Sequence, residues 1–214
     1  MIIQLVRKDI IMHYKQMLQH FLFIIGMIVL WYYTKTSIMM MYLFATFISA
    51  NALTMKNLGE EDKNDVTKFL MTLPITRREL IASKYTTSLL FMVVGSVIPL
   101  IFVGTLDFFV NGFVDPPWKM LFFSYIGNLV NIAIMLGVYY RFGAKKVRYI
   151  FVGFIIIMVA VVIFMQQANT LAQLIHWYSH ANQVLYGIFA VISSAILFCF
   201  SLQASQKYFA KKEL

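Results

Sequence analysis

Six long apolar runs constrain the fold of this chain more than any other feature of its sequence. They lie at about 21–33, 37–55, 86–106, 120–140, 149–165 and 184–202. Most of them approach the roughly 20 residues that a helix needs to cross about 30 Å of hydrocarbon. With 61% hydrophobic and only 13% charged residues, the composition lies well outside that of soluble domains. The sequence therefore predicts an all-α integral membrane protein with six transmembrane helices in a single domain, residues 1–214.

The distribution of basic residues predicts how these helices are oriented. Of the 18 Lys and Arg residues, only Lys35 and Lys119 fall in loops on one side of the predicted membrane. The rest lie before the first run, in the loops after the second and fourth runs, or after the last run. Because cytoplasmic loops carry the excess of Lys and Arg, we expect both termini in the cytoplasm.

The net charge of +9 does not indicate nucleic-acid binding. The basic residues are spread over several loops next to the membrane, whereas nucleic acid requires a clustered basic face. Membrane topology and contact with anionic lipid explain the charge better. Membrane lipid is therefore an expected partner, and nucleic acid is not.

The N-terminal segment, about residues 1–18, has an amphipathic pattern. Five apolar residues recur at spacings of three and four, and the basic residues fall off their stripe. The stripe consists of Ile3, Val6, Ile10, Tyr14 and Met17. This pattern favours an interfacial helix on the inner leaflet. The alternative is a direct extension of the first span, because periodicity alone does not locate a bend.

A second amphipathic segment, DVTKFLMTLP at 65–74, lies between the second and third runs. Its apolar positions follow the i, i+3, i+4, i+7 pattern of one helix face. They are Val66, Phe69, Leu70 and Leu73. Pro74 disfavours helical geometry at the preceding residue and ends the element. Such a stripe docks either on a partner protein or on the membrane surface, and the scarcity of basic residues on its polar face favours a partner.

The residues after Pro74 carry a helix start signal. Thr76 and Glu79 match the T-x-x-E capping box, with Arg77 and Arg78 between them. We therefore expect a new helix that begins here and continues into the third span. The region from about 57 to 84 would then hold a short cytoplasmic helix, a break and the entry of a transmembrane helix.

The run LPITRRELIASKY at 73–85 also resembles a known family. It is similar to the L-P-x-[ST]-R-x-E-[LI]-x-x-[SA]-K-Y pattern before the third span in membrane subunits of bacterial ABC-2 type exporters. The likeness extends to the six spans and the amphipathic N-terminus, and thus to the whole chain. It implies a permease in the cytoplasmic membrane of a bacterium that moves an amphipathic or hydrophobic substrate, such as a peptide, an antibiotic or a lipid-like molecule.

The resemblance also implies partners and roles. In that family the helix between spans two and three is a coupling helix docked on a separate ATPase, and two permease chains, identical or related, assemble with two ATPases. Carried over by position, the docking contacts would be Val66, Phe69, Leu70 and Leu73, with Pro74 as the break. The entry of the gate helix would comprise Thr76, Arg77, Arg78, Glu79 and Lys84.

No phosphate-loop motif G-x-x-x-x-G-K-[ST] occurs in the sequence. We therefore expect this chain to bind no cofactor and to have no enzymatic activity of its own. ATP and Mg²⁺ would act in the partner ATPase, whose closure would drive the permease between alternating states.

Three asparagines fall inside the apolar runs. Asn51 lies in the second run, and Asn128 and Asn131 lie one helical turn apart in the fourth. Hydrogen bonding between helices is the first interpretation, and lining of a substrate path is the second. No acidic residue lies at the middle of a predicted span, which argues against an ion pathway.

Two further features carry weaker predictions. His176 and His180 stand at i and i+4, but no third ligand accompanies them, so we expect no metal site. Cys199 is the sole cysteine and is expected to face lipid or pack.

Two other functions remain open. A non-transporting membrane scaffold or immunity protein would use the same cytoplasmic helix to hold a partner. An ion-coupled carrier would transport without any ATPase.

Overall fold

The computed structural model describes residues 2–33, 38–63, 70, 72, 75–111, 118–143, 146–153, 155–156 and 183–210. Five long α-helices account for most of them. These are α1 (Ile2–Tyr33), α2 (Ile38–Lys63), α4 (Arg77–Asn111), α5 (Trp118–Phe142) and α8 (Gln183–Ala210). Five of the six predicted spans therefore coincide with helices, and most of the run at 149–165 lies outside the described residues.

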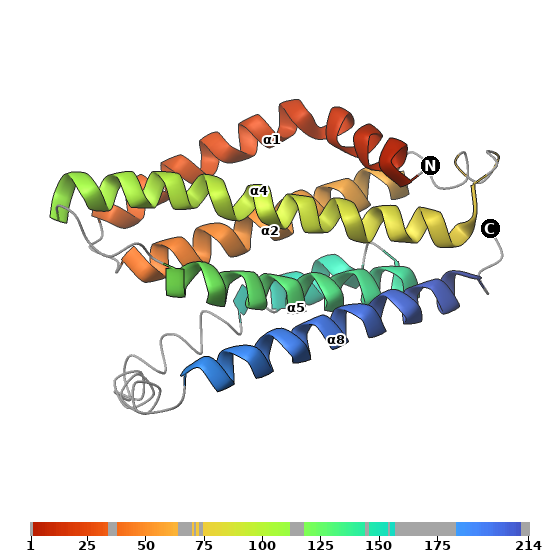
Figure 1. Ribbon diagram of the computed structural model, residues 1–214. Coiled ribbons are helices and arrows are strands. Elements are labelled where there is room, and N and C mark those ends of the chain that lie inside the picture. The colour runs from red at the N-terminus through yellow and green to blue at the C-terminus, as the bar shows by residue number, and fades with distance from the viewer. Residues whose placement is uncertain are drawn as a thin grey trace.

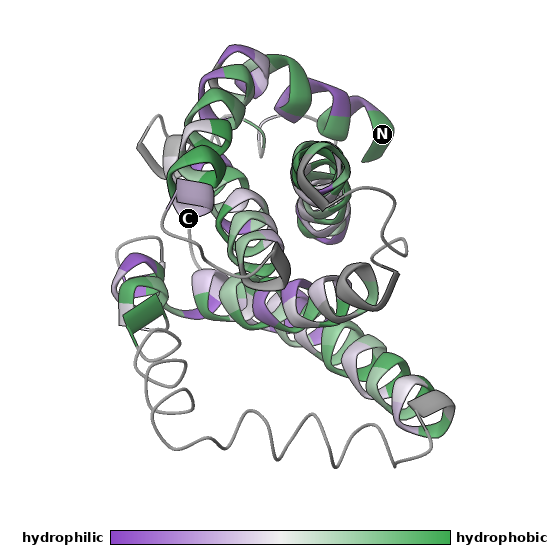
Figure 2. Ribbon diagram, turned by 90° about the vertical axis from the view of Figure 1, so that its left-hand side faces the viewer, coloured by the Kyte–Doolittle hydropathy of each residue, from purple (hydrophilic) through white to green (hydrophobic). Residues whose placement is uncertain are grey.

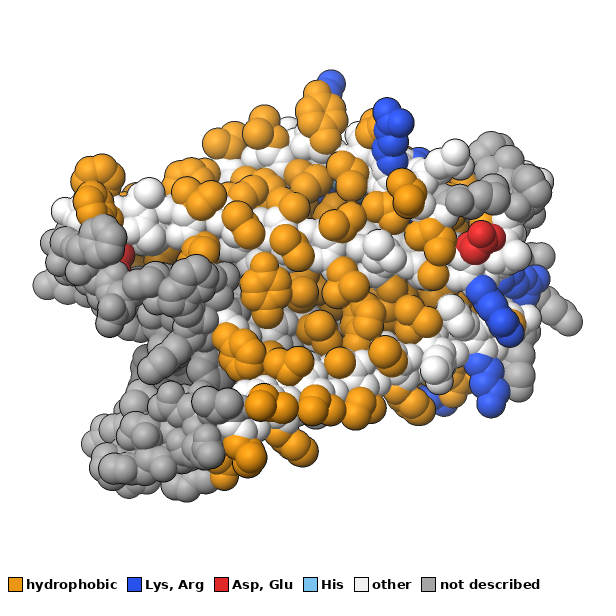
Figure 3. All heavy atoms as spheres, in the orientation of Figure 1, with side chains coloured by type: hydrophobic (Ala, Val, Ile, Leu, Met, Phe, Trp, Pro, Cys, Tyr) orange, Lys and Arg blue, Asp and Glu red, His pale blue; other side chains and the backbone are white. Residues whose placement is uncertain are grey.

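The long helices form an elongated bundle in which α2 packs along α4 and α5 packs along α8 (Figure 1). The start of α1 and the end of α8 lie at the same end of the bundle. Space-filling atoms show orange hydrophobic side chains over the middle of the visible face (Figure 3). The blue Lys and Arg side chains on that face gather in the half that holds both termini.

Helix α1 combines two elements that the sequence distinguishes. Its parts Ile2–Lys15 and Met17–Tyr33 diverge by 56°, and Figure 2 shows the N-terminal arm turning across the bundle. The bend lies close to where the sequence changes from mixed to apolar. The arm is thus continuous with the first apolar run, as the alternative interpretation held, but it does not extend straight from it.

The apolar stripe of this arm mostly faces away from the bundle. Ile3 is 83% exposed and Tyr14 is 58% exposed, and Ile10 is exposed as well, whereas Val6 is buried. The buried side of the arm holds the polar residues Asp9 and His13 together with the apolar residues Leu5 and Val6. An exposed apolar stripe suits an interfacial helix, whose apolar face meets lipid, and the interfacial position stays a prediction.

Helices α2 and α4 approach each other closely at Gly95. A Cβ atom at this position would lie 3.0 Å from the backbone nitrogen of Ala50 and 3.2 Å from the Cβ of Ser49. Small residues at a crossing let the backbones of membrane helices come together. Gly95 therefore sets the separation of α2 and α4.

Helix α5 ends at a glycine cap. Gly143 adopts a φ of 84°, and its N–H donates to the carbonyl of Tyr139 at 2.8 Å. Glycine takes up this left-handed conformation without the steric cost that a side chain would bring. A short helical stretch at 146–153 follows, and the ring of its Phe151 stacks on that of Phe47 in α2.

Within the described residues, two helices are long and apolar enough to cross a membrane: Arg77–Phe109 and Leu185–Ala210. The bent α1 raises the number to three if its two parts form one span. The structure thus bears out an all-α membrane protein with two to three candidate spans. Cys199 lies in α8, one of these candidate spans, and its side chain is exposed.

We predict that Gly95→Val destabilises the protein by about 1–3 kcal/mol, because the added methyl groups must force α2 and α4 apart. Gly104→Val in the same helix is the matched control, since a Cβ there meets nothing within 4 Å. Thermal unfolding in detergent, followed by size-exclusion chromatography, measures the difference. Equal losses of stability in the two variants would contradict the close approach of α2 and α4 at Gly95.

Candidate functional site

The candidate site is built around the first two turns of α4. The predicted capping box is present there. The Thr76 N–H and Thr76 Oγ1 donate to Glu79 Oε2 at 3.1 and 2.9 Å, and the Glu79 N–H donates to Thr76 Oγ1 at 3.2 Å. These reciprocal bonds satisfy backbone donors that the helix itself leaves open. The start of α4 predicted from the sequence is thereby confirmed.

Arg77 joins the start of α4 to the end of α8. Its Nη1 donates to the carbonyl of Ala210 at 2.9 Å and to that of Phe209 at 3.3 Å. The last carbonyls of a helix lack partners within the helix and form its negative dipole end, so a guanidinium is favourable there. The neighbouring Arg78 is exposed.

Two turns further on, Lys84 forms a buried ion pair with Asp9 of the α1 arm. The Lys84 Nζ to Asp9 Oδ2 distance is 2.8 Å, and the two residues are 1% and 0% exposed. The other carboxylate oxygen lies 3.2 Å from Nζ of the half-buried Lys8. A buried charge is tolerated only when it is paired and hydrogen-bonded, so these contacts fix the arm against α4.

Neutral side chains complete the network around this pair. Lys84 Nζ also donates to Asn57 Oδ1 of α2 at 3.2 Å, and Thr87 Oγ1 donates to Asp9 Oδ2 at 3.2 Å. His13 Nε2 lies 3.2 Å from Asn57 Oδ1. An amide oxygen only accepts, so His13 Nε2 is the donor in this contact. The network therefore binds α1, α2 and α4 together.

The ionisation of Asp9 follows from these neighbours. Asp9 lies in the α1 arm, well before the apolar run that begins at residue 21. Burial alone would raise the pKa of its carboxyl, but the charge and hydrogen bond of Lys84, assisted by Lys8, outweigh burial and lower the pKa. The stabilisation is thus present above the unfolded carboxyl pKa of about 4 and is lost as pH falls through the lower folded value.

Tyr85 connects α4 to the other helix pair. Its hydroxyl lies 2.8 Å from both Ser201 Oγ and Ser205 Oγ of α8. Ser201 Oγ in turn donates to the carbonyl of Ala133 in α5. Because Ser201 uses its single hydrogen there, Tyr85 donates to Ser201 and accepts from Ser205. Together with Arg77, this series of hydrogen bonds links the start of α4 to α8 and α5.

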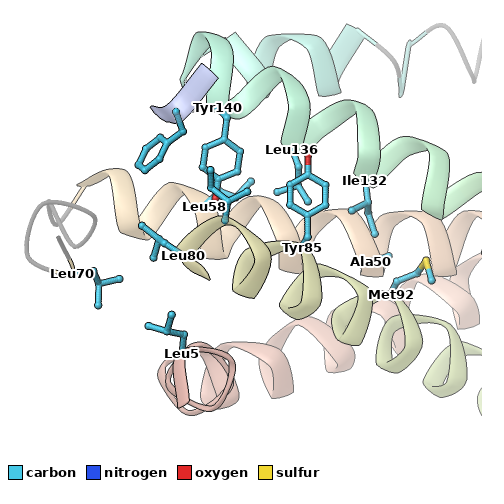
Figure 4. Packing of buried hydrophobic residues seen from close by; sticks show 12 residues of the cluster. Leu5, Ala50, Leu58, Leu70, Leu80, Tyr85, Met92, Ile132, Leu136 and Tyr140 are labelled. Carbon is cyan, nitrogen blue, oxygen red and sulfur yellow. The ribbon is translucent and has the colours of Figure 1, made fainter. Parts of the chain in front are cut away.

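Leu70 is the described member of the predicted docking stripe. It is buried and belongs to one apolar cluster with Leu5 of α1, Leu58 of α2 and Leu80 of α4 (Figure 4). Its side chain packs inside this chain, against residues of three helices. The other predicted docking residues, Val66, Phe69 and Leu73, and the break at Pro74 lie outside the described residues.

The asparagines predicted inside the apolar runs are buried and make hydrogen bonds. Asn131 Nδ2 donates to Asn51 Oδ1 at 2.6 Å, which joins α5 to α2. Asn128 Nδ2 donates to Ser124 Oγ at 3.3 Å, and Ser124 Oγ donates to Thr46 Oγ1 of α2 at 2.7 Å. Hydrogen bonding between helices is therefore present, and a role in a substrate path stays a prediction.

Asp9, His13 and Asn57 were not predicted from the sequence as members of this network. One signal was available, because Asp9 is the sole acidic residue before Glu60 in a segment otherwise basic and apolar. Its partner Lys84 lies 75 residues away, so no local pattern connects them. In the part of the chain that the structure describes, no group of three or more potential metal ligands comes together; His176 and His180 lie outside that part.

We predict that Lys84→Met destabilises the protein by about 3–5 kcal/mol, because the buried charge of Asp9 loses its closest cation. The double variant Lys84→Met/Asp9→Leu should recover most of this loss, since both charges are removed. Lys8→Met is the matched control and should cost less than about 1 kcal/mol, as expected for a partly exposed pair. Unfolding in mixed micelles measures all three, and equal effects of Lys84→Met and Lys8→Met would contradict the assignment.

Comparison of the sequence with known families gives a match over most of the chain. The sequence model described as "ABC-2 family transporter protein" matches residues 4–210, nearly the whole chain. No curated protein and no solved structure matches the chain. The family match covers every helix described above, from the α1 arm to the end of α8, and the chain therefore belongs to the ABC-2 transporter family.

Proposed function

We propose that this chain is the membrane subunit of an ATP-driven exporter that moves an amphipathic or hydrophobic substrate across the cytoplasmic membrane of a bacterium. A separate ATPase subunit supplies the energy and docks on residues 66–73. Two permease chains, identical or related, form the translocating unit. Membership of the ABC-2 family supports a membrane component that works with an ATPase.

The observation that carries this proposal is the bonding of the first turns of α4. These turns directly follow the docking segment, and they are tied to α8 through Arg77 and to α1 and α2 through Lys84. A displacement of the segment therefore reaches three other helices through charged or hydrogen-bonded contacts. An element that transmits ATPase closure into a membrane bundle requires such connections.

Several observations support a topology of six spans with both termini in the cytoplasm. The start of α1 and the end of α8 share one end of the bundle, which an even number of crossings requires (Figure 1). The basic side chains on the visible face lie in the same half of the molecule (Figure 3). The exposed apolar stripe of the α1 arm is suited to the inner leaflet beside them.

The docking segment can be tested with Phe69→Asp, which places a carboxylate in the proposed interface. We expect the tagged wild-type chain to retain an ATP-hydrolysing subunit in mild detergent, and Phe69→Asp to lose it by tenfold or more. Leu70 is unsuitable for this test, because it is buried and its substitution would disturb folding.

Thr72→Asp is the matched control for this experiment. Thr72 lies on the same segment but off the apolar stripe, and its side chain is exposed. The same added charge should leave the ATPase bound. If no ATPase accompanies even the wild-type chain, the exporter proposal is wrong; if it binds all variants equally, residues 66–73 are not the docking surface.

The connection from α4 to α8 generates a separate prediction. Arg77→Gln should leave the ATPase bound but change its rate of ATP hydrolysis in the purified complex, by about threefold or more, because α8 loses the guanidinium at its carbonyl end. Arg78→Gln, which alters the exposed neighbour, should leave the rate within experimental error. Equal rates of ATP hydrolysis in Arg77→Gln and wild type would show that this contact does not transmit ATPase closure from α4 to α8.

A further inference from the structure

A cavity of about 310 Å³ opens between α2, α5 and the short helix at 146–153. It lies apart from the Asp9–Lys84 network and shares none of the polar residues of that network. Its wall includes Ala52 and Met55 of α2, Tyr139 of α5, and Phe151. Such a volume accommodates part of a small molecule or the head region of a lipid.

Two cations line this cavity. Lys56 comes from α2 and Arg148 from the 146–153 helix, and both side chains are exposed at the surface. Among the residues whose side chains the structure describes, no carboxylate lines the cavity, and no hydrogen bond or ion pair joins either cation to a partner. Two cations at one cavity form a site suited to an anion, in particular to a phosphate or carboxylate oxygen.

The remaining wall is apolar and continues beyond the cavity. The ring of Phe151 stacks on that of Phe47, with centroids 6.3 Å apart and planes inclined by 17°. Phe47 precedes Met55 by eight residues on α2, which corresponds to about 12 Å along a helix. An apolar surface thus leads from the cations toward the apolar middle of α2. A soluble anion would use the two cations alone, whereas an amphiphile would use both features.

We propose that this cavity binds an anionic phospholipid. The phosphodiester of the lipid lies between Lys56 and Arg148. One of its acyl chains extends along Met55 and Phe151 toward Phe47. Both cations belong to segments where helices leave or enter an apolar run, at the level where lipid head groups lie. The inference concerns lipid binding by this chain and holds whether or not the chain transports a substrate.

The test uses the purified full-length chain in detergent and a titration with phosphatidylglycerol or phosphatidylcholine, followed by native mass spectrometry. We expect preferential binding of phosphatidylglycerol. Lys56→Gln/Arg148→Gln should weaken this binding by about thirtyfold, since each cation near an anionic head group contributes roughly fivefold. Arg7→Gln/Lys207→Gln removes the same charge from exposed positions outside the cavity and should weaken it by less than threefold.

A second variant tests the apolar half of the site without changing charge. Ala52→Phe places a ring in the cavity and should weaken phosphatidylglycerol binding by at least fivefold while the thermal stability of the chain is retained. Glycerol 3-phosphate, which has the head-group charge but no acyl chain, should not compete at millimolar concentration.

Three outcomes would overturn the proposal. Equal losses in the cavity and control double variants would show general surface attraction. Competition by glycerol 3-phosphate at lipid-like affinity would identify a soluble anion as the ligand. Unchanged binding in both the Lys56→Gln/Arg148→Gln and Ala52→Phe variants would place the lipid elsewhere on the chain.

Discussion

The buried ion pair between Asp9 and Lys84 determines how the helices meet at one end of the bundle. Removing two charges from water costs several kcal/mol for each ion, and only close contact with further hydrogen bonds offsets that cost. Here Asn57 and Thr87 provide those bonds, from α2 and α4. The requirement for all partners at once means that α1, α2 and α4 share a single arrangement. Apolar contacts alone would permit several arrangements of these helices, because such contacts are not directional.

Charged contacts and neutral polar contacts lie at different levels along the bundle. Charged contacts occur at the start of α4, at Arg77 and Lys84, next to the end of the bundle that holds both termini. Among the described residues inside the apolar runs, helices α2 and α5 are joined by neutral groups, chiefly Asn51 with Asn131. A neutral amide costs far less to bury than an ion, so this division follows from the environment of each level.

The parts of this structure that follow local rules were predictable from the sequence. The capping box at Thr76 and Glu79 depends on residues three apart, and the apolar runs depend on composition within about 20 residues. The partners of Asp9 and Asn51 were not predictable, because they lie 75 and 80 residues away along the chain. A helical wheel also identified the apolar stripe of the α1 arm, but it could not show that Asp9 and His13, beside that stripe, are the polar residues that pack on protein.

The sequence predicts a short docking helix around Leu70, and a helix of that length needs an internal anchor. A helix of about ten residues is marginal alone in water, so the segment before α4 must gain stability from tertiary contacts. Complete burial of one leucine contributes roughly 1.5–3 kcal/mol, enough to offset much of the cost of ordering one or two residues. Because Leu70 is buried together with Leu5 and Leu80, the same contact that stabilises the segment also connects it to α1 and α4. A force applied to the segment would therefore act on the two helices that the Asp9–Lys84 pair already holds together.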